Sequence, residues 1–164
     1  MTTLPIRIGH GYDIHRFGSK NPLVLGGVEI PHDKGLVAHS DGDCLTHAIC
    51  DALLGALGLE DIGVFFPNDD PKLEGISSLK ILREVIEKCD EAGYILGNLD
   101  STIVAEEPMI TPHVQLMKKT LAKELRSSLS SIAIKATTNE QIGDLGRSEG
   151  IAAFAVCLLV AKSP

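Results

Sequence analysis

The chain has 164 residues, a length that suits one domain able to bury roughly 70% of the surface of its unfolded chain. Its net charge is −7, it has no Lys/Arg-rich run, and only 4% of its residues are aromatic, none of them Trp. These features exclude the usual nucleic-acid binders, because phosphate affinity comes from clustered cations and single-stranded bases stack on aromatic side chains.

The N-terminal part of the chain predicts a strand, a hairpin arm and a turn. Residues 5–16 alternate loosely in hydrophobicity and predict a strand. Residues 23–31, with two glycines among them, predict a hairpin arm. A polar turn follows at residues 39–43, in which Ser40 or Asp41 can cap the helix that comes next.

Apolar residues recur at three- and four-residue steps over residues 45–57, which predicts the first helix. Asp43, His47 and Asp51 form a polar stripe at four-residue spacing beside the apolar one. We therefore expect His47 to face away from most of the core. Residues 58–75 are rich in Gly, Pro, Asp and Asn and predict a long loop, a place where functional side chains often lie.

The second half predicts two helices and three strands. Residues 77–92 predict a helix that ends at a glycine, and residues 94–105 predict a strand. Thr111, as a cap, opens a helix that runs to Leu125. Residues 132–138 predict a strand, and residues 150–161 predict another that is apolar on both faces.

This interleaving of strands and helices predicts an α+β fold with one sheet and helices packed on one face. The doubly apolar last strand leaves two possibilities: a sheet covered within the chain, or association with other subunits. The last strand is also the longest apolar run, and it is too short to cross a bilayer. The N-terminus lacks a signal-peptide pattern, and the four cysteines form no C-x-x-C pair. We expect buried thiols, a cytoplasmic location and no membrane partner.

Asp13, His15 and His47 are the candidate metal ligands. Residues two apart on a strand point to the same side, so Asp13 and His15 can act together, and His47 can add a third ligand from the helix. Three protein ligands with one open position are typical of catalytic zinc. Spacing alone does not show that the three side chains converge.

Two further segments carry groups that suit phosphate. His39 and Ser40 precede a helix N-terminus, where free backbone N–H groups favour an anion. Residues 135–140 provide paired threonines and Glu140 after a strand, and residues 143–150 add Arg147. Hydroxyls and a guanidinium suit phosphate oxygens, and a carboxylate suits a hard divalent cation. Each of these features also fits an ordinary turn.

Taken together, these motifs resemble one enzyme family. Residues 9–15, 38–43, 61–67, 135–140 and 147–150 match, in order and spacing, the motifs of 2-C-methyl-D-erythritol 2,4-cyclodiphosphate synthases of the non-mevalonate isoprenoid pathway. The resemblance runs from about residue 6 to 162. It implies a single catalytic domain over residues 1–164, a ferredoxin-like subunit, and a homotrimer with active sites between subunits.

The implied enzyme is a phosphorus–oxygen lyase. It converts 4-diphosphocytidyl-2-C-methyl-D-erythritol 2-phosphate to the cyclic diphosphate and releases CMP. Because the attacking 2-phosphate and the diphosphate belong to one molecule, catalysis would consist mostly of positioning and charge neutralisation. The implied cofactors are one zinc ion per site and a second divalent ion, magnesium or manganese.

The resemblance also implies residue roles. Asp13, His15 and His47 would hold zinc, Glu140 would help to hold the second ion, and His39 and Thr138 would be catalytic. The implied substrate-binding residues are Asp13, His15, His39, Ser40, Asp61, Ile62, Gly63, Phe66, Asp70, Ala105, Pro108, Thr111, Thr137, Thr138, Asn139, Glu140 and Arg147. Three positions depart from the family pattern: Met109 replaces a lysine, Asp144 an aromatic residue and Ser148 a glycine.

Two other hypotheses follow from the same residues. In the first, a zinc-bound water hydrolyses a phosphate ester or an amide, with Asp43 or Asp51 as general base. In the second, the metal is structural and closed by a fourth protein ligand, and the chain is a binding or oligomerisation module.

Overall fold

The computed structural model describes residues 5–67 and 69–162. Outside the described residues lie 1–4, 68 and 163–164. Residues 1–4 belong to the N-terminal segment whose lack of a signal-peptide pattern led us to expect a cytoplasmic location. Asn68 belongs to the loop predicted to bind substrate. The strands are β1 (Ile6–Ser19), β2 (Leu23–Leu25), β3 (Val28–Ile30), β4 (Gly35–Leu36), β5 (Tyr94–Val104), β6 (Ile132–Thr137) and β7 (Gly150–Ala161). The helices are α1 (Cys44–Leu57), α2 (Ile62–Phe65), α3 (Ser78–Glu91), α4 (Val114–Glu124) and α5 (Gly143–Gly146), with 3-10 turns η1 (Pro71–Leu73), η2 (Thr111–His113) and η3 (Leu129–Ser131).

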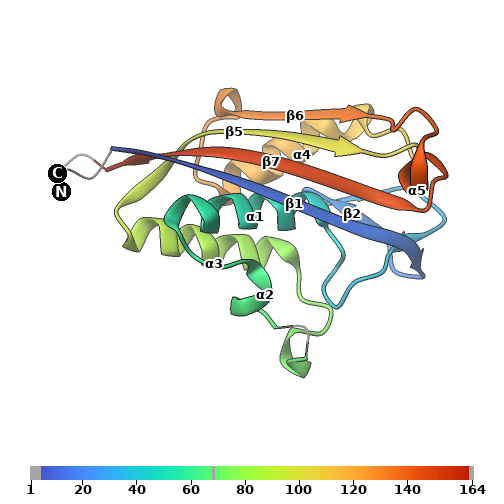
Figure 1. The fold of residues 1–164 in the computed structure, drawn as a ribbon, viewed down its shortest axis with the longest axis horizontal. Helices are drawn as coiled ribbons and strands as arrows, with labels where there is room; N and C mark the ends of the chain where they lie inside the picture. The colour runs from blue at the N-terminus through green and yellow to red at the C-terminus, as the bar shows by residue number, and fades with distance from the viewer. Residues whose placement is uncertain (1–4, 68, 163–164) are drawn as a thin grey trace.

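The main sheet has the strand order β4-β1-β7-β5-β6. Figure 1 labels four of these strands, β1, β7, β5 and β6, side by side. β7 lies between β1 and β5 and is antiparallel to both, whereas β5 and β6 are parallel. The parallel pair needs a crossover, which α4 supplies. β2 and β3 form a separate two-stranded sheet. The predicted α+β class and the single main sheet are confirmed.

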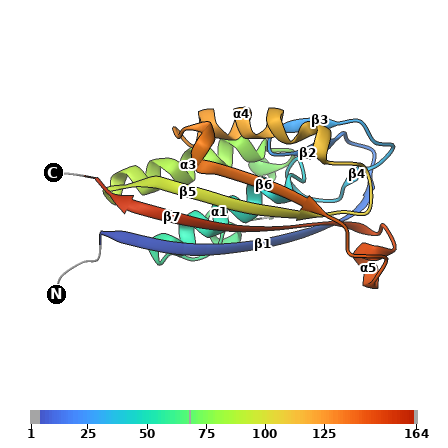
Figure 2. The same ribbon diagram turned by 90° about the horizontal axis from the view of Figure 1, so that it is seen from above.

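One face of the sheet carries α1, α3 and α4 (Figure 2). Residues on this face alternate along each strand and are buried, as in Leu99 and Ile103 of β5 and Ile132 of β6. Met117 and Leu121 of α4 pack into the same core. The predicted helix layer on one face is therefore correct.

The opposite face of the sheet is open and apolar in the single chain. Ile8 is 67% exposed, and Tyr12, Phe154 and Val156 are also exposed. The rings of Tyr12 and Phe154 lie 4.9 Å apart across β1 and β7. Of the two possibilities left by the sequence, coverage within the chain is therefore wrong for this face.

Several local predictions need correction. Neither Ser40 nor Asp41 caps α1; Asp43 does, accepting a hydrogen bond from Thr46 N at 3.0 Å. Thr111 does not cap α4 either, because it opens the turn η2 and makes no capping hydrogen bond. The predicted loop 58–75 contains α2 and η1.

Two predictions at other points are confirmed. Gly93 follows α3 with a φ of 80°, the left-handed conformation expected after a helix end. Cys44, Cys50, Cys89 and Cys157 are free and buried. Within the described residues, no helix is both long and apolar enough to cross a membrane.

Candidate active site

Asp13 and His15 of β1 converge with His47 of α1. The Oδ2 atom of Asp13 lies 2.9 Å from His15 Nε2 and 3.0 Å from His47 Nδ1, and the two imidazole nitrogens lie 3.2 Å apart. One ligand atom from each residue falls within 4.8 Å of the others. The convergence that spacing could not show is thus present.

The close approach of α1 to β1 produces this convergence. A Cβ atom placed on Gly9 would lie 1.8 Å from Ala52 O, and one on Gly11 would lie 1.9 Å from Ala48 O. The two glycines therefore let the helix backbone lie directly on the strand. Asp13 and His15 continue the same face of β1, and His47 precedes Ala48 on the helix.

Burial at this cluster differs from the sequence expectation. His47 is only 6% exposed, so the prediction that it faces away from most of the core is wrong. Its side chain lies between helix and sheet because the glycines allow α1 to pack closely on β1. On its other side, Ser78 Oγ of α3 lies 2.8 Å from His47 Nε2. The side chains of Asp13 and His15 remain partly accessible.

The three groups stabilise one another electrostatically. Burial raises the pKa of Asp13, but hydrogen bonds and charge from His15 and His47 outweigh it and hold this pKa well below its ordinary value. Burial lowers the pKa of His47, but the hydrogen bond and charge of Asp13 outweigh this and raise it overall. Asp13 is therefore a carboxylate across the neutral range and is ready to bind a cation.

The donor set fits zinc. One carboxylate oxygen and two imidazole nitrogens are common zinc ligands, and three protein ligands leave a fourth position open. Within the part of the chain that the structure describes, this cluster contains no fourth His, Cys, Asp or Glu. A structural site closed by four protein ligands is therefore disfavoured.

The cluster opens into a cavity of about 370 Å³. The cavity brings together eight of the predicted residues: Asp13, His15, His39, Ser40, His47, Ile62, Gly63 and Phe66. Ser40 Oγ lies 3.1 Å from His47 Nε2, and His39 Nε2 lies 3.2 Å from the carbonyl oxygen of Asp70. Asp70 caps η1 through its carboxylate, which accepts a hydrogen bond from Lys72 N.

Asp61 lies beside this cavity, at the start of α2. It caps that helix by accepting a hydrogen bond from Gly63 N at 2.8 Å. Its side chain lines a neighbouring hollow of about 250 Å³ that also contains Asp51. Asp51 accepts a hydrogen bond from Ile62 N at 2.8 Å and so anchors α2 to α1.

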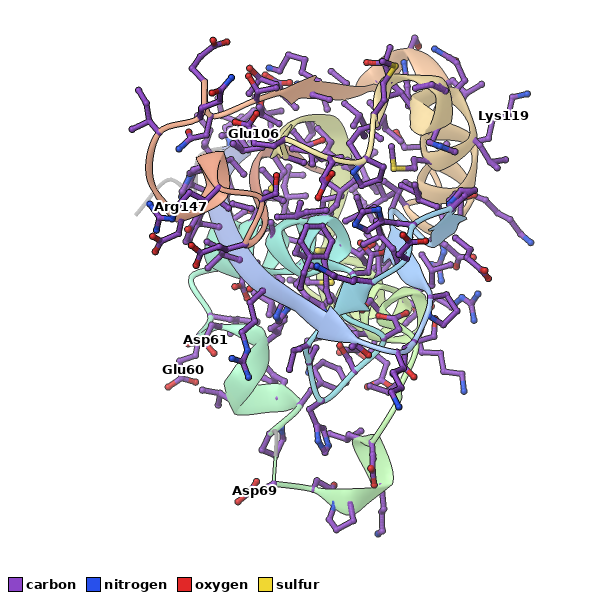
Figure 3. The ribbon with its side chains drawn as sticks, turned by 90° about the vertical axis from the view of Figure 1, so that its right-hand side faces the viewer. Glu60, Asp61, Asp69, Glu106, Lys119 and Arg147 are labelled. Carbon is purple, nitrogen blue, oxygen red and sulfur yellow. The ribbon has the colours of Figure 1, made fainter. Side chains whose placement is uncertain are left out.

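A second cavity, of about 210 Å³, lies where β5 and β6 end. It brings together the predicted residues Ala105, Pro108, Thr111, Thr137 and Thr138. Met109, at the position where a lysine was expected, also lines it and is 75% exposed. This cavity shares no lining residue with the first. Figure 3 shows Asp61 beside α2, well apart from Glu106, which lines the cavity at the ends of β5 and β6.

The remaining predicted residues line neither cavity. Glu140 is exposed, with a φ of 51°, and its carboxylate accepts a hydrogen bond from Thr138 Oγ1 at 3.2 Å. Asn139 donates its side-chain N–H to Ile142 O. Arg147 is exposed and forms ion pairs with Asp144 and Glu149. Ser148 has a φ of 58°, which accounts for the glycine expected there.

Sequence reasoning missed three residues that support the site. Glu106 accepts hydrogen bonds from Asn139 N at 2.9 Å and Gln141 N at 3.1 Å, and so shapes the turn that carries Glu140. Ser78 and Asp41 support His47 from behind. No local pattern signals these roles, because each partner lies more than 30 residues away in sequence.

The structure counts against the hydrolase hypothesis. Asp43 is fully buried, and both of its oxygens accept hydrogen bonds, from Gly26 N, Gly27 N and Thr46. Asp51 is held by Ile62 N and lines the hollow next to Asp61 instead of the metal cavity. Neither carboxylate named as a general base is available to a water in the metal cavity.

Comparison with known proteins agrees with this geometry. A 2-C-methyl-D-erythritol 2,4-cyclodiphosphate synthase from Cyanothece sp. is 56% identical over 94% of this chain and 96% of its own. The structure of IspF from Plasmodium falciparum in a CDP complex is 35% identical, with a TM-score of 0.87, and covers 99% of this chain and 100% of its own. Bifunctional IspDF from Campylobacter jejuni is 40% identical with a TM-score of 0.93; the match covers 97% of this chain but 43% of that longer one.

The sequence model of the YgbB family matches residues 6–160. That span includes the Asp13, His15 and His47 cluster and both cavities. The chain therefore belongs to the YgbB family, whose sequence model it matches over nearly its whole length.

Proposed function

We propose that this protein converts 4-diphosphocytidyl-2-C-methyl-D-erythritol 2-phosphate to 2-C-methyl-D-erythritol 2,4-cyclodiphosphate and CMP. The observation that carries the proposal is the Asp13, His15 and His47 cluster, which opens into a cavity lined by His39 and Ser40. Relatives that are more than half identical over almost the whole chain are named 2-C-methyl-D-erythritol 2,4-cyclodiphosphate synthases.

The proposed reaction is an intramolecular displacement. An oxygen of the 2-phosphate forms a bond to the β-phosphorus, the bond from that phosphorus to the bridging oxygen breaks, and CMP leaves with that oxygen. No protein nucleophile is required. The protein lowers the barrier by holding the two phosphates in line and by surrounding their charge with donors.

The metal cluster and its neighbours would bind the diphosphate. Zinc bound by Asp13, His15 and His47 would supply Lewis-acid polarisation of a phosphate oxygen. His39 and Thr138 would donate hydrogen bonds to the charge that develops on phosphate oxygens. Ser40 and Thr137 would hold neighbouring phosphate oxygens.

Glu140 would help to hold a second divalent ion, magnesium or manganese. Its carboxylate is exposed, so phosphate oxygens and water can complete the ligand set, as is usual for magnesium. Asn139 and Arg147 would lie near the same phosphates. Glu106 fixes the backbone on both sides of Glu140 and so supports this arrangement.

The cavity at the ends of β5 and β6 would bind the nucleotide. Backbone groups from Ala105 to Thr111, with Pro108 between them, would recognise cytosine, which agrees with the scarcity of aromatic side chains for stacking. Asp61 would bind a ribose hydroxyl. Ile62, Gly63, Phe66 and Asp70 would line the methylerythritol side.

We further propose a homotrimer with active sites between subunits. The metal cavity and the nucleotide cavity share no residue within one chain, so a neighbouring subunit would bring the two halves together. The apolar sheet face around Ile8, Tyr12 and Phe154 would be buried at the trimer interface. A cytoplasmic location accords with four buried, reduced thiols.

Product analysis tests the reaction. The purified protein is incubated with the cytidylyl substrate, zinc and magnesium, and the phosphorus products are followed by ³¹P NMR. We expect CMP and a cyclic diphosphate in equal amounts. Linear phosphates would indicate a hydrolase and contradict the proposal.

A further inference from the structure

Ser78 and Asp41 hold His47 from the side opposite to the other metal ligands. The Nδ1 atom of His47 faces Asp13 and His15, whereas its Nε2 atom lies 2.8 Å from Ser78 Oγ. The hydroxyl of Ser78 in turn donates a hydrogen bond to Asp41 Oδ1. Ser78 is fully buried, so water does not replace these contacts.

The donors and acceptors of this chain fix its direction. An aspartate carboxylate only accepts hydrogen bonds, and Asp41 Oδ2 already accepts one from Ser78 N at 2.9 Å. The single hydroxyl proton of Ser78 is therefore directed to Asp41, and Ser78 Oγ accepts from His47 Nε2–H. Because Nε2–H donates to Ser78, the nitrogen left to bind a metal is Nδ1, which faces the Asp13 carboxylate oxygen at 3.0 Å in this structure.

The segments that carry these residues are tied together by their backbones. Gly75 N donates to His39 O at 2.8 Å, and Asp41 N donates to Ile76 O at 3.0 Å. The start of α3 is thereby fixed against the turn that carries His39 and Asp41. The position of Ser78 relative to His47 is therefore set by the fold.

Ser40 has a different place in the same network. Its Oγ atom lies 3.1 Å from His47 Nε2 but also accepts a hydrogen bond from Gly42 N at 3.2 Å. Ser40 lines the metal cavity, whereas Ser78 does not. The proton of the Ser40 hydroxyl is not committed to a carboxylate, so it is available to a ligand in the cavity.

We propose that Ser78 and Asp41 are positioning residues that select the His47 tautomer with Nδ1 free to bind metal. This inference rests on the metal site of the proposed function. A histidine that binds metal through one nitrogen commonly donates from the other to a fixed acceptor, and loss of such an acceptor weakens metal binding about 10- to 100-fold.

Zinc binding to the metal-free protein tests the inference without an activity assay. The protein is titrated with zinc in competition with a chromophoric chelator, and the thermal midpoint of each variant is recorded. Ser78→Ala should weaken zinc binding about 10- to 100-fold. Ser77→Ala is the matched control, because Ser77 makes no capping hydrogen bond, and it should bind like wild type.

Asp41→Asn is the second variant and keeps the size of the side chain. Its amide can donate to Ser78 Oγ, so the Ser78 hydroxyl would turn to His47 Nε2 and leave the proton on Nδ1. Zinc affinity should fall at least about 10-fold. This variant decides the question if Ser78→Ala does not fold.

The outcomes separate this inference from the proposed function. If wild type fails to bind one zinc per chain, the metal site of the proposed function is wrong. If wild type binds zinc and the folded variants bind equally well, Ser78 and Asp41 do not position His47. A lower thermal midpoint with unchanged zinc affinity would also overturn the inference, because it indicates a structural role alone.

Discussion

Gly11→Ala should separate α1 from β1 and thereby disrupt the metal cluster. A Cβ atom at this position would lie 1.9 Å from Ala48 O, whereas an ordinary contact is 3.4 Å or more. The helix must therefore retreat by about 1.5 Å, since a backbone oxygen cannot rotate away. His47 adjoins Ala48, and metal–ligand distances tolerate only about 0.2 Å.

We expect this substitution to lower the free energy of unfolding by about 1–3 kcal/mol or more, the usual cost of overpacking. Zinc affinity should fall by more than the 10- to 100-fold typical of losing a supporting hydrogen bond, about 100-fold or beyond. Urea unfolding and zinc titration measure the two effects.

Gly55→Ala is the matched control for this prediction. Gly55 also lies in α1, but a Cβ there would meet nothing nearer than His10 O at 3.8 Å. Alanine in a helix interior should raise the free energy of unfolding by about 0.5–1 kcal/mol and leave zinc binding unchanged. Wild-type stability and zinc affinity in Gly11→Ala would refute the idea that close backbone packing builds the site.

Four further predictions follow from the site. His47→Ala should abolish zinc binding and turnover, as measured by metal analysis after gel filtration; zinc at wild-type stoichiometry would refute its role as a ligand. Thr138→Ala should lower kcat by about 100-fold or more with zinc retained, as for loss of a donor to transition-state charge; unchanged kinetics would remove Thr138 from the mechanism. The hydrogen bond and charge of Asp13 outweigh the effect of burial and raise the pKa of His47 above the ordinary imidazole value of 6.5. Because zinc competes with this proton, zinc affinity should keep rising as the pH increases beyond 6.5. A zinc titration series that levels off below that pH would contradict this. Asp51→Ala leaves Ile62 N without its acceptor and should raise KM more than it lowers kcat, because α2 loses its anchor; steady-state kinetics with unchanged KM would show that the anchor is not needed.

The strands and helices were largely predictable because their signals are local. The segment 150–161, predicted as a strand that is apolar on both faces, has the same bounds as β7. The predicted hairpin arm 23–31 contains the β2–β3 hairpin. The short helix α2 was missed because it has only four residues, and its N-terminus depends on Asp51, which lies on another helix. Helix caps were misassigned for a similar reason, since Asp41 binds the start of α3 while Asp43 caps α1.

The metal ligands were predictable as residue types, whereas their environment was not. The stripe of Asp43, His47 and Asp51 looks solvent-facing on an isolated helix. In the fold, His47 is buried because α1 packs directly on the glycines of β1 and α3 covers the helix start. The division of the site into two cavities is also a tertiary property, and no spacing along the chain encodes it.

Mixing two impaired variants tests the shared site most directly, because the proposed site takes its metal half and its nucleotide half from different chains. His47→Ala and Thr138→Ala chains are unfolded together in equal amounts, refolded with zinc and magnesium, and assayed for the cyclic diphosphate. Random assembly gives both intact halves in about one site in four, so we expect about a quarter of wild-type activity. Activity no greater than that of the two variants assayed separately would contradict a cyclase site shared between subunits.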